Sequence, residues 1–190
     1  MTSDCNCIFC DPEKIKSQLS DGTPCKSDFY EDEDTFAILA EEQYTTGHAL
    51  LILKNHKTDI TYNLLPGELS AFINAIHKVS KLLKRIVKND QGEKPERIYV
   101  CILCDGVEHL HAHLIPRYPF THQDKNTYQK LFINRDNVNG VYEKIKEGKL
   151  GGYWYIAERE KNWKSSEYGS GSSSNKAKIL EDLAKELRWM

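Results

Sequence analysis

The chain has 190 residues, of which 39% are hydrophobic, 10% aromatic and 28% charged. This composition is typical of a globular protein and excludes a disordered, collagen-like or membrane-spanning chain. Its 26 basic and 28 acidic residues give a formal net charge of -2. Because no broad positive field would attract nucleic acid or anionic lipid, we expect chemistry on a small molecule, without binding to a nucleic-acid scaffold or a membrane.

The N-terminal segment lacks the basic and apolar regions of a signal peptide, and the chain has no run of about 18 apolar residues. We therefore expect a cytoplasmic protein. The six cysteines are then not expected to form disulfides, because the cytosol is reducing. Each cysteine is instead expected to be a metal ligand or a buried thiol.

The first part of the chain predicts several strands and one long helix. Two β-type runs, at 29–39 and 48–53, flank a Thr-Thr-Gly turn and predict a hairpin. Apolar residues spaced three and four apart predict an amphipathic helix over 66–90. Two further β-type runs, at 97–104 and 109–116, predict an antiparallel pair. The fold class is therefore α+β.

Residues 1–120 predict one domain and residues 121–190 a C-terminal extension. The Gly/Ser-rich stretch 169–174 within the extension predicts a flexible linker. After it, apolar residues on one face predict a terminal helix over 176–189.

The most informative segment is His109-Leu-His111-Ala-His113. On a strand, the period of two places three imidazoles on one face, about 6.5 Å apart. Core packing does not explain this alternation, because each buried ring demands polar partners. Two functional interpretations follow: a three-histidine metal site, or a histidine nucleophile that attacks phosphorus and is flanked by two others. Neighbouring rings on a strand point parallel, whereas the ligand nitrogens of a tetrahedral ion must converge to about 2.0 Å from one point.

Together with Cys7-Ile-Phe-Cys10 and the Gly47-His48 dipeptide, this segment resembles the histidine triad (HIT) family. The resemblance covers residues 5–120 and implies an antiparallel sheet of about five strands with a long amphipathic helix. It also implies a nucleotidyl hydrolase or transferase that acts at the α-phosphate of a nucleotide conjugate, of the dinucleoside polyphosphate or nucleoside phosphoramidate type. Family members are usually homodimers, so a homodimer is expected.

The resemblance assigns a role to each histidine of the segment. His111 matches the family's nucleophile, which forms a nucleotidyl-histidine intermediate that water cleaves. His113 would contact the phosphoryl oxygens, and the backbone carbonyl of His109 would hold His111 in the required tautomer. His48 matches a position beside the site, where a hydrogen bond within the core is an equally open alternative. The apolar residues implied to line a base pocket, for which plain core packing is the alternative, are Ile8, Phe9, Phe36 and Ile38.

Cys7 and Cys10 have the spacing with which two thiolates chelate one ion. By resemblance, His56 and His109 complete a closed tetrahedral site in some family members, so that Zn²⁺ would be structural and not catalytic. Such an ion would also orient the strand that carries the nucleophile. Reduced cysteines without metal are the alternative, and Cys5 is a further candidate ligand.

The remaining C-x-x-C motif joins Cys101 and Cys104 within a predicted strand. Residues three apart on a strand face opposite sides of the sheet, so these two cysteines are expected to be small core residues.

The chain departs from the family pattern at two places. The family's phosphate-contacting Gly-Gln-Ser or Gly-Gln-Thr is absent, and Asp105 or Glu108 would repel a phosphate unless one of them acts as a general acid. Ala40 stands where family members often carry the Asp or Asn that binds the ribose hydroxyls, with Glu41 or Glu42 as possible substitutes. The nucleoside and the leaving group therefore stay open.

Two other function classes fit the same residues. One is a nucleotide-binding module that keeps the triad and turns over little substrate, as the missing phosphate loop would permit. The other is a metallohydrolase that uses the three histidines as ligands of a catalytic ion.

Overall fold

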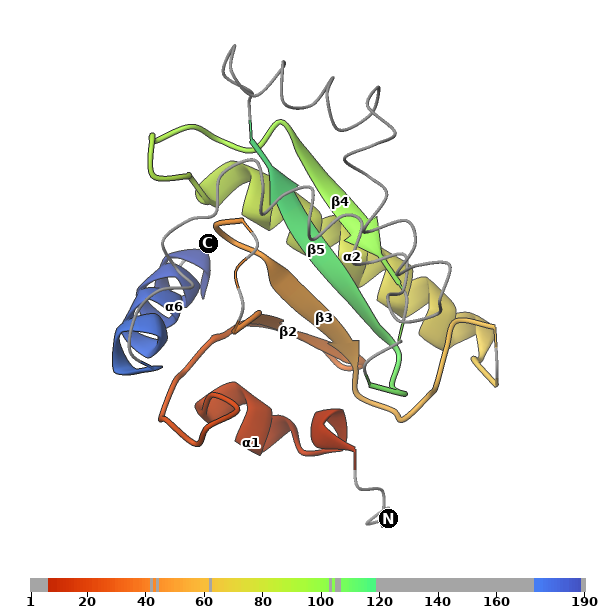
Figure 1. Cartoon of the computed structure of the whole chain (residues 1–190). Coiled ribbons are helices and arrows are strands. Elements are labelled where there is room, and N and C mark those ends of the chain that lie inside the picture. Colours follow the sequence, from red (N-terminus) through yellow and green to blue (C-terminus); the bar gives the residue numbers. More distant parts are fainter. Residues whose placement is uncertain are drawn as a thin grey trace, which may run out of the picture.

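The computed structural model describes residues 7–41, 43, 45–61, 63–102, 104, 107–118 and 173–188. Cys5, Glu42, Asp105 and residues 121–172 of the predicted extension lie outside these ranges. In chain order the elements are η1 (Ile8–Cys10), α1 (Pro12–Ser17), β1 (Asp28–Glu31), β2 (Thr35–Leu39), β3 (Ala49–Leu53), α2 (Pro66–Ile86), β4 (Arg97–Cys101), β5 (His111–Arg117) and α6 (Ser173–Arg188) (Figure 1).

The five strands form one antiparallel sheet in the order β1-β2-β3-β5-β4. This arrangement confirms the predicted α+β class and the predicted antiparallel sheet. Among the described residues, no helix is both long enough and apolar enough to cross a membrane.

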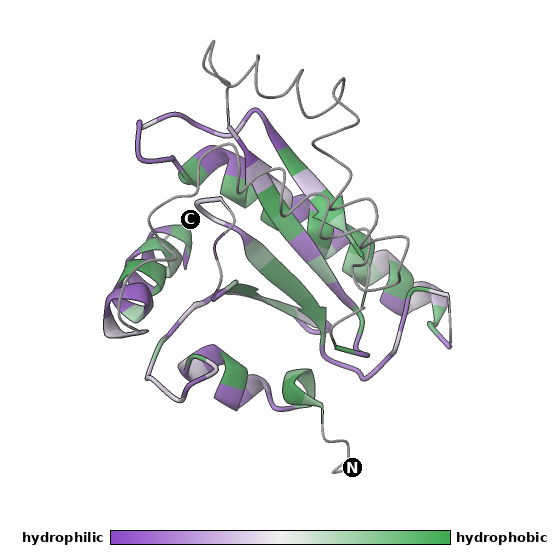
Figure 2. Cartoon of the chain, viewed as in Figure 1, coloured by the Kyte–Doolittle hydropathy of each residue, from purple (hydrophilic) through white to green (hydrophobic). Residues whose placement is uncertain are grey.

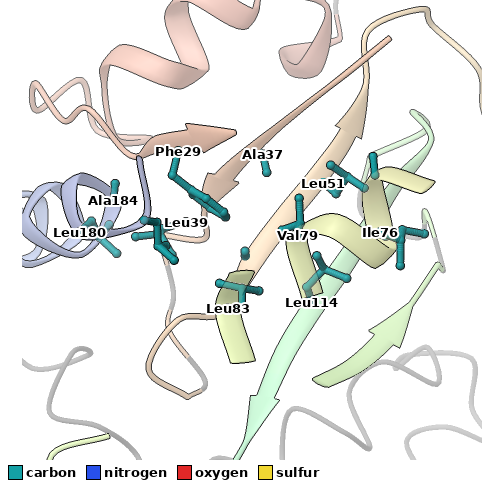
Figure 3. Packing of buried hydrophobic residues seen from close by; sticks show 14 of the residues in the cluster. Phe29, Ala37, Leu39, Leu51, Ile76, Val79, Leu83, Leu114, Leu180 and Ala184 are labelled. Atoms are coloured by element: carbon teal, nitrogen blue, oxygen red, sulfur yellow. The ribbon is translucent and has the colours of Figure 1, made fainter. Parts of the chain in front are cut away.

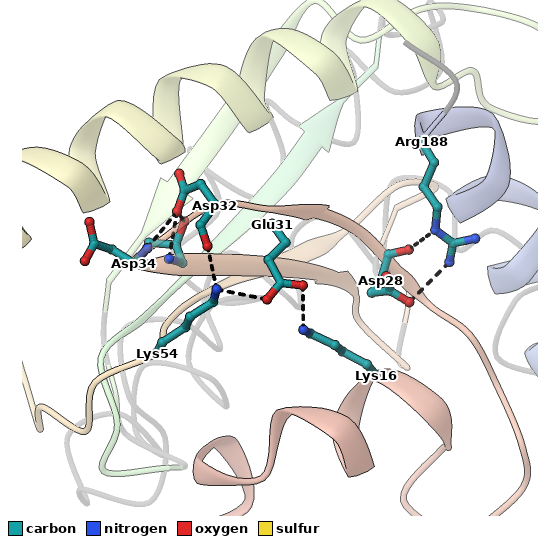
Figure 4. Close-up of polar contacts among 8 residues, drawn as sticks. Lys16, Asp28, Glu31, Asp32, Asp34, Lys54 and Arg188 are labelled. Carbon is teal, nitrogen blue, oxygen red and sulfur yellow. Dashed lines mark hydrogen bonds and ion pairs between the residues drawn. The ribbon is translucent and has the colours of Figure 1, made fainter.

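The single strand expected at 29–39 is wrong, because a tight turn divides this segment into β1 and β2. One side-chain oxygen of Asp32 accepts hydrogen bonds from the backbone N–H of Asp34 and of Thr35, at 3.2 and 2.8 Å. A short polar side chain that satisfies the backbone donors after it is a common way to build a turn. Figure 4 shows this contact at the end of β1.

The predicted long helix is confirmed, although α2 ends at Ile86 and not at 90. Pro66 lies in the first turn of α2, where backbone N–H groups have no partner within the helix, so the N–H that proline lacks costs no hydrogen bond. The backbone N–H of Leu65 donates to the carboxylate of Glu68 at 2.9 Å, which satisfies a further donor at this end. At the other end Val87 is extended and completely buried, so the chain leaves the helix towards the core.

Three other predicted boundaries also move. Strand β4 ends at Cys101, and Cys104 has a left-handed backbone with φ of 54°, so the strand expected over 97–104 is too long. Strand β5 begins at His111 and not at His109. Helix α6 begins at Ser173, inside the predicted linker, and ends its described part at Arg188.

One face of the sheet carries the main core. Alternate residues of the three central strands point to this face, where α2 and α6 pack against them (Figure 3). Figure 2 shows that β3 is hydrophobic along most of its length, whereas α2 and α6 carry both hydrophobic and hydrophilic positions. Burial of each such leucine or phenylalanine contributes about 1.5–3 kcal/mol.

Helix α6 is part of this core. It buries Ala177, Leu180, Ala184 and Leu187 in the same cluster as the sheet residues. Near its end, the guanidinium of Arg188 donates to the backbone carbonyl of Asp28 at 2.6 Å and pairs with the Asp28 carboxylate at 3.3 Å (Figure 4). The terminal helix therefore packs on the sheet, beside its edge strand β1.

The other face of the sheet is covered by η1 and α1, where Phe9, Phe36, Ile38 and Ile52 form a second buried cluster. The ammonium of Lys16 on α1 lies 4.9 Å from the centre of the Phe36 ring. The same ammonium and that of Lys54 both pair with Glu31, at 2.7 and 2.9 Å (Figure 4). The two contacts of Lys16 hold α1 against the face that also carries two histidines of the triad.

Candidate functional site

Strand β5 places His111 and His113 on the face covered by η1 and α1. Their partners on β3 are Ile52 and Leu50, which belong to or pack on the second cluster. The alternation expected of these two histidines is confirmed. The strand start expected at His109 is wrong, because His109 precedes β5. Its ring still lies on the side covered by η1, since Phe9 packs edge-on against His109 as well as His111, with centroids 5.7 and 5.0 Å away.

His111 is held in one tautomer by the backbone. Its Nδ1 lies 2.7 Å from the carbonyl oxygen of His109. A carbonyl oxygen only accepts, so Nδ1 carries the proton and donates it. In the neutral ring Nε2 then keeps its lone pair, which is the state a nitrogen nucleophile requires. The ring of Phe9 packs edge-on against the His111 ring, with centroids 5.0 Å apart.

His113 lies beside His48. Nδ1 of His113 and Nε2 of His48 are 3.1 Å apart, and the two rings stack with centroids separated by 5.4 Å. Burial, with smaller contributions from His48 and His111, lowers the pKa of His113 from 6.5 to about 3. His113 is therefore neutral near pH 7, and one proton lies between it and His48.

Cys7, Cys10, His56 and His109 form a compact cluster, with one candidate ligand atom from each residue lying within 4.8 Å of the others. The short helix η1 turns the chain so that the two cysteines approach, with the N–H of Cys10 donating to the carbonyl of Cys7 at 3.0 Å. His56 follows β3, and His109 precedes β5. Three segments far apart in the sequence thus contribute to one cluster.

His109 turns an unprotonated nitrogen towards the cysteines. Its Nε2 donates to the carbonyl of Leu53 at 2.6 Å, so Nδ1 carries no proton in the neutral ring. Burial is the main cause that lowers the pKa of His109, which favours this neutral form. Nδ1 lies 3.4 Å from the Cys7 sulfur and 3.2 Å from Nδ1 of His56.

These distances fit a tetrahedral ion. Around zinc, two ligand nitrogens are separated by about 3.3 Å, and a nitrogen and a sulfur by about 3.6 Å. The nitrogen–nitrogen distance here is 3.2 Å, and the nitrogen–sulfur distances from Cys7 to His109 and from Cys10 to both histidines lie between 3.3 and 3.7 Å. Two cysteines and two histidines are also a donor set that zinc prefers. The cluster can therefore hold a metal ion of this kind.

A cavity of about 240 Å³ opens between α1 and the histidine-bearing face of the sheet. Its apolar walls include Ile8, Ile15, Ile38 and Leu50, and Leu50 is the strand partner of His113. Polar groups at the wall belong to Lys14, Gln18, Ser20, Ser27 and Glu41. The cavity thus combines apolar walls with a few polar groups, as sites for small molecules do.

Of the four residues expected around a base, Ile8 and Ile38 line this cavity. Phe9 and Phe36 are buried in the cluster beside it and are not among its lining residues. Ala40 is buried, whereas the carboxylate of Glu41 reaches the wall and accepts hydrogen bonds from the backbone N–H and the hydroxyl of Ser20, at 2.8 and 3.0 Å.

Comparison with known proteins identifies the architecture around these residues. Residues 25–120, which include His48, His56 and all three triad histidines, match the family model of the HIT domain. The chain belongs to the HIT family.

Its HIT relatives include Protein hit from Bacillus subtilis, which is 29% identical over 120 residues, covering 60% of this chain and 72% of the relative. An uncharacterized HIT-like protein from Methanocaldococcus jannaschii is 31% identical over 119 residues, covering 59% and 79% of the two chains. A crystal structure of a Hit-like protein involved in cell-cycle regulation from Bartonella henselae, 20% identical, superposes with a TM-score of 0.55 over 99% of this chain and 98% of that one. At 20% sequence identity, this similarity shows that the two proteins share a fold.

Two further cysteines of this HIT chain, Cys25 and Cys101, are buried and are not part of the cluster. Cys25 is buried against α6, where burial raises the pKa of its thiol to about 11. Cys101 is buried as expected, and burial raises the pKa of its thiol as well. Both thiols are thus protonated near pH 7, which is typical of structural cysteines.

One group that orients the site was not found from the sequence. The carbonyl oxygen of Leu53 selects the tautomer of His109, and with it the nitrogen that faces the cysteines. Every residue has such a carbonyl, so no side-chain pattern marks this one before the fold is known.

We predict that His113 stays neutral when the pH falls from 8 to 5, because its folded pKa is about 3. Its pKa in the unfolded chain is near 6.5, so below that pH the unfolded state binds the proton first. The free energy of unfolding therefore decreases as the pH falls from about 6.5 towards 3. NMR titration of the ring and urea unfolding at pH 7 and 4.5 measure these effects. His113→Asn should lose less stability over this range than the wild type, and a ring that titrates near pH 6.5 would contradict the prediction.

Proposed function

We propose that the protein is a nucleotidyl hydrolase or transferase that acts at the α-phosphate of a nucleotide conjugate. The observation that carries this proposal is the hydrogen bond from Nδ1 of His111 to the carbonyl of His109, because it leaves Nε2 with its lone pair. Membership of the HIT family supports the same reaction class. Suitable substrates are dinucleoside polyphosphates and nucleoside phosphoramidates.

The reaction proceeds in two displacements at phosphorus. The lone pair on Nε2 of His111 forms a nitrogen–phosphorus bond, while the bond from the α-phosphorus to the leaving group breaks and its electron pair departs with that group. A water or acceptor oxygen then attacks the same phosphorus and the nitrogen–phosphorus bond breaks, which restores the imidazole. Covalent catalysis of this type divides one difficult displacement into two easier ones.

His113 and His48 support the transferred group. His113 is neutral, so it offers one N–H donor without adding a positive charge beside the nucleophile. When His48 donates to Nδ1 of His113, the proton of His113 is on Nε2 and is available to a phosphoryl oxygen. Together with His48, His113 is thus a preorganised donor two residues beyond His111, at the next position on the same face of β5.

The nucleoside of the substrate would occupy the cavity under α1. Apolar side chains such as Ile38 and Leu50 can pack on a base, and Leu50 brings the cavity next to His113. Glu41 is the acidic group at the wall and would accept hydrogen bonds from the ribose hydroxyls in place of the residue at Ala40. Phe9 and Phe36, which are buried in the second cluster, would pack against the side chains that line the cavity.

We also propose that Zn²⁺ binds to Cys7, Cys10, His56 and His109. Four protein ligands close the coordination shell, so the ion would stabilise the fold and would not bind substrate. Its contribution would be to connect η1, the end of β3 and the start of β5, and so to fix His109. A three-histidine catalytic site fits less well, because His109 faces the cysteines while Nδ1 of His111 is bonded to a carbonyl.

A homodimer is the proposed assembly. Strand β4 lies at the edge of the sheet, and Val100 on this strand is 43% exposed. The exposed side chains of Leu65, Leu69 and Ile73 follow one side of α2 or its N-cap. Pairing of β4 with the β4 strand of a second copy of this chain would give the backbone groups at this edge hydrogen-bond partners and would cover apolar surface.

We expect a nucleotidyl adduct on wild-type protein and none on His111→Asn. Asparagine cannot act as the nucleophile, so turnover should fall by about a thousandfold or more. The experiment incubates each protein with dinucleoside polyphosphates and nucleoside phosphoramidates of adenosine and guanosine, quenches at alkaline pH and measures the intact mass. His77→Asn on the exposed surface of α2 is the matched control and should behave as wild type. Nucleotide binding without adduct or turnover in the wild type would favour the binding module instead.

Metal analysis tests the zinc assignment. Protein purified without chelator should contain about one zinc per chain, and Cys7→Ala should lose it, because removal of a thiolate opens the closed site. His113→Ala and Cys101→Ala should retain the metal. Retention in Cys7→Ala with loss in His113→Ala would support the three-histidine site, and wild-type protein without zinc would overturn the assignment.

A further inference from the structure

The loop between β2 and β3, which carries His48, is organised around one buried amide (Figure 1). Gln43 is only 8% exposed. Its side-chain nitrogen donates to the carbonyl oxygens of Ala40 and His48, both at 2.7 Å. Its side-chain oxygen accepts from the backbone N–H of Gly47 at 2.8 Å. Both donors and the acceptor of this amide are therefore used on backbone groups of its own loop.

These three bonds require an amide. Two carbonyl oxygens need two donors and one N–H needs an acceptor, and among the side chains only asparagine and glutamine combine them in this way. A carboxylate at the same place would direct lone pairs at both carbonyls, and an apolar side chain would leave the three backbone groups to find other partners. Ala40 and His48 are also joined directly, since the N–H of Ala40 donates to the carbonyl of His48 at 2.9 Å.

The rest of the loop is anchored from outside. The hydroxyl of Thr45 donates to the carbonyl of Pro116 at 2.7 Å, and the hydroxyl of Tyr118 donates to that of Thr46 at 2.7 Å. Gly47 has φ of +84°, and a Cβ there would lie 2.8 Å from a methyl carbon of Val87, so a side chain does not fit. These contacts seat the loop on the sheet and on the end of α2.

Among the side chains that anchor this loop, the amide of Gln43 bonds to His48 itself, and the N–H of His48 donates to the backbone carbonyl of Thr45 at 3.0 Å. The Gln43 amide binds the carbonyl of His48 and the N–H of Gly47, and so fixes the backbone from which the His48 ring projects. That ring places Nε2 at 3.1 Å from Nδ1 of His113. A short chain of contacts thus leads from the buried amide to the donor that faces the reacting group.

We propose that Gln43 is a positioning residue, which sets the place of His48 and through it the tautomer of His113. The consequence for turnover rests on the proposed function, in which His113 donates to a phosphoryl oxygen. The consequence for the His48–His113 pair does not depend on turnover. The two consequences are therefore measured separately.

The test compares Gln43→Glu and Gln43→Ala with Gln91→Glu, which makes the same change at an exposed position. Long-range proton–nitrogen NMR records the ring nitrogens of His48, His113 and His111, and steady-state kinetics follow the best conjugate of the substrate screen. We expect altered His48 and His113 nitrogen signals in both Gln43 variants, an unchanged His111 tautomer, and kcat lower by about 10- to 100-fold. Gln91→Glu should match the wild type in every measurement.

A general loss of structure would alter all three rings, so the selective change identifies positioning. If Gln43→Glu does not fold, Gln43→Ala decides the question, because it removes the bonds without adding a charge. Wild-type signals for His48 and His113 in a folded Gln43 variant would overturn the proposal. Altered signals in a wild-type protein that turns over no conjugate would keep the role of Gln43 and reject the proposed function.

Discussion

The site depends on His109 more than on any other residue, because its ring and its backbone make three different connections. Nε2 donates to the carbonyl of Leu53 at the end of β3, and Nδ1 faces Cys7, which precedes η1, and Cys10, the last residue of η1. The carbonyl accepts from Nδ1 of His111. His109 thus belongs to the cysteine–histidine cluster and also selects the tautomer of the proposed nucleophile. A displacement of His109 would disturb the cluster and the His111 ring together.

The antiparallel register makes this arrangement possible. Because side chains alternate across a sheet, the strands can bury one set of residues against α2 and α6 while the other set faces α1. His111 and His113 belong to the second set, so their environment is shaped by a small cluster and a cavity, and the large core on the opposite face supplies most of the buried apolar area. The lowered pKa of His113 is a direct result of this burial.

Much of this organisation follows from local patterns. The apolar stripe of α2, the alternation of His111 with His113, and the close spacing of Cys7 and Cys10 each involve residues that are neighbours within one element. The turn at Asp32 was missed because it contains no glycine or proline, although an aspartate that bonds to the N–H groups after it is a recognised turn former. The contacts made by the Leu53 carbonyl and the Gln43 amide were not predictable, because they depend on backbone groups that only the folded chain brings near them. The strand start predicted at His109 was wrong because the N–H of His109 donates to the carbonyl of Val107 in its own loop, a contact that the alternation of side chains does not indicate.

The carbonyl of His109 holds the proton of His111 on Nδ1 and so leaves the lone pair on Nε2, the proposed nucleophile. Long-range proton–nitrogen NMR of histidine-labelled protein measures this directly, with the His111 ring assigned from its absence in His111→Asn. We predict a protonated Nδ1 and an unprotonated Nε2 in the neutral ring near pH 7. A neutral ring with its proton on Nε2 would contradict it, because the lone pair would then point at the carbonyl and not at the substrate.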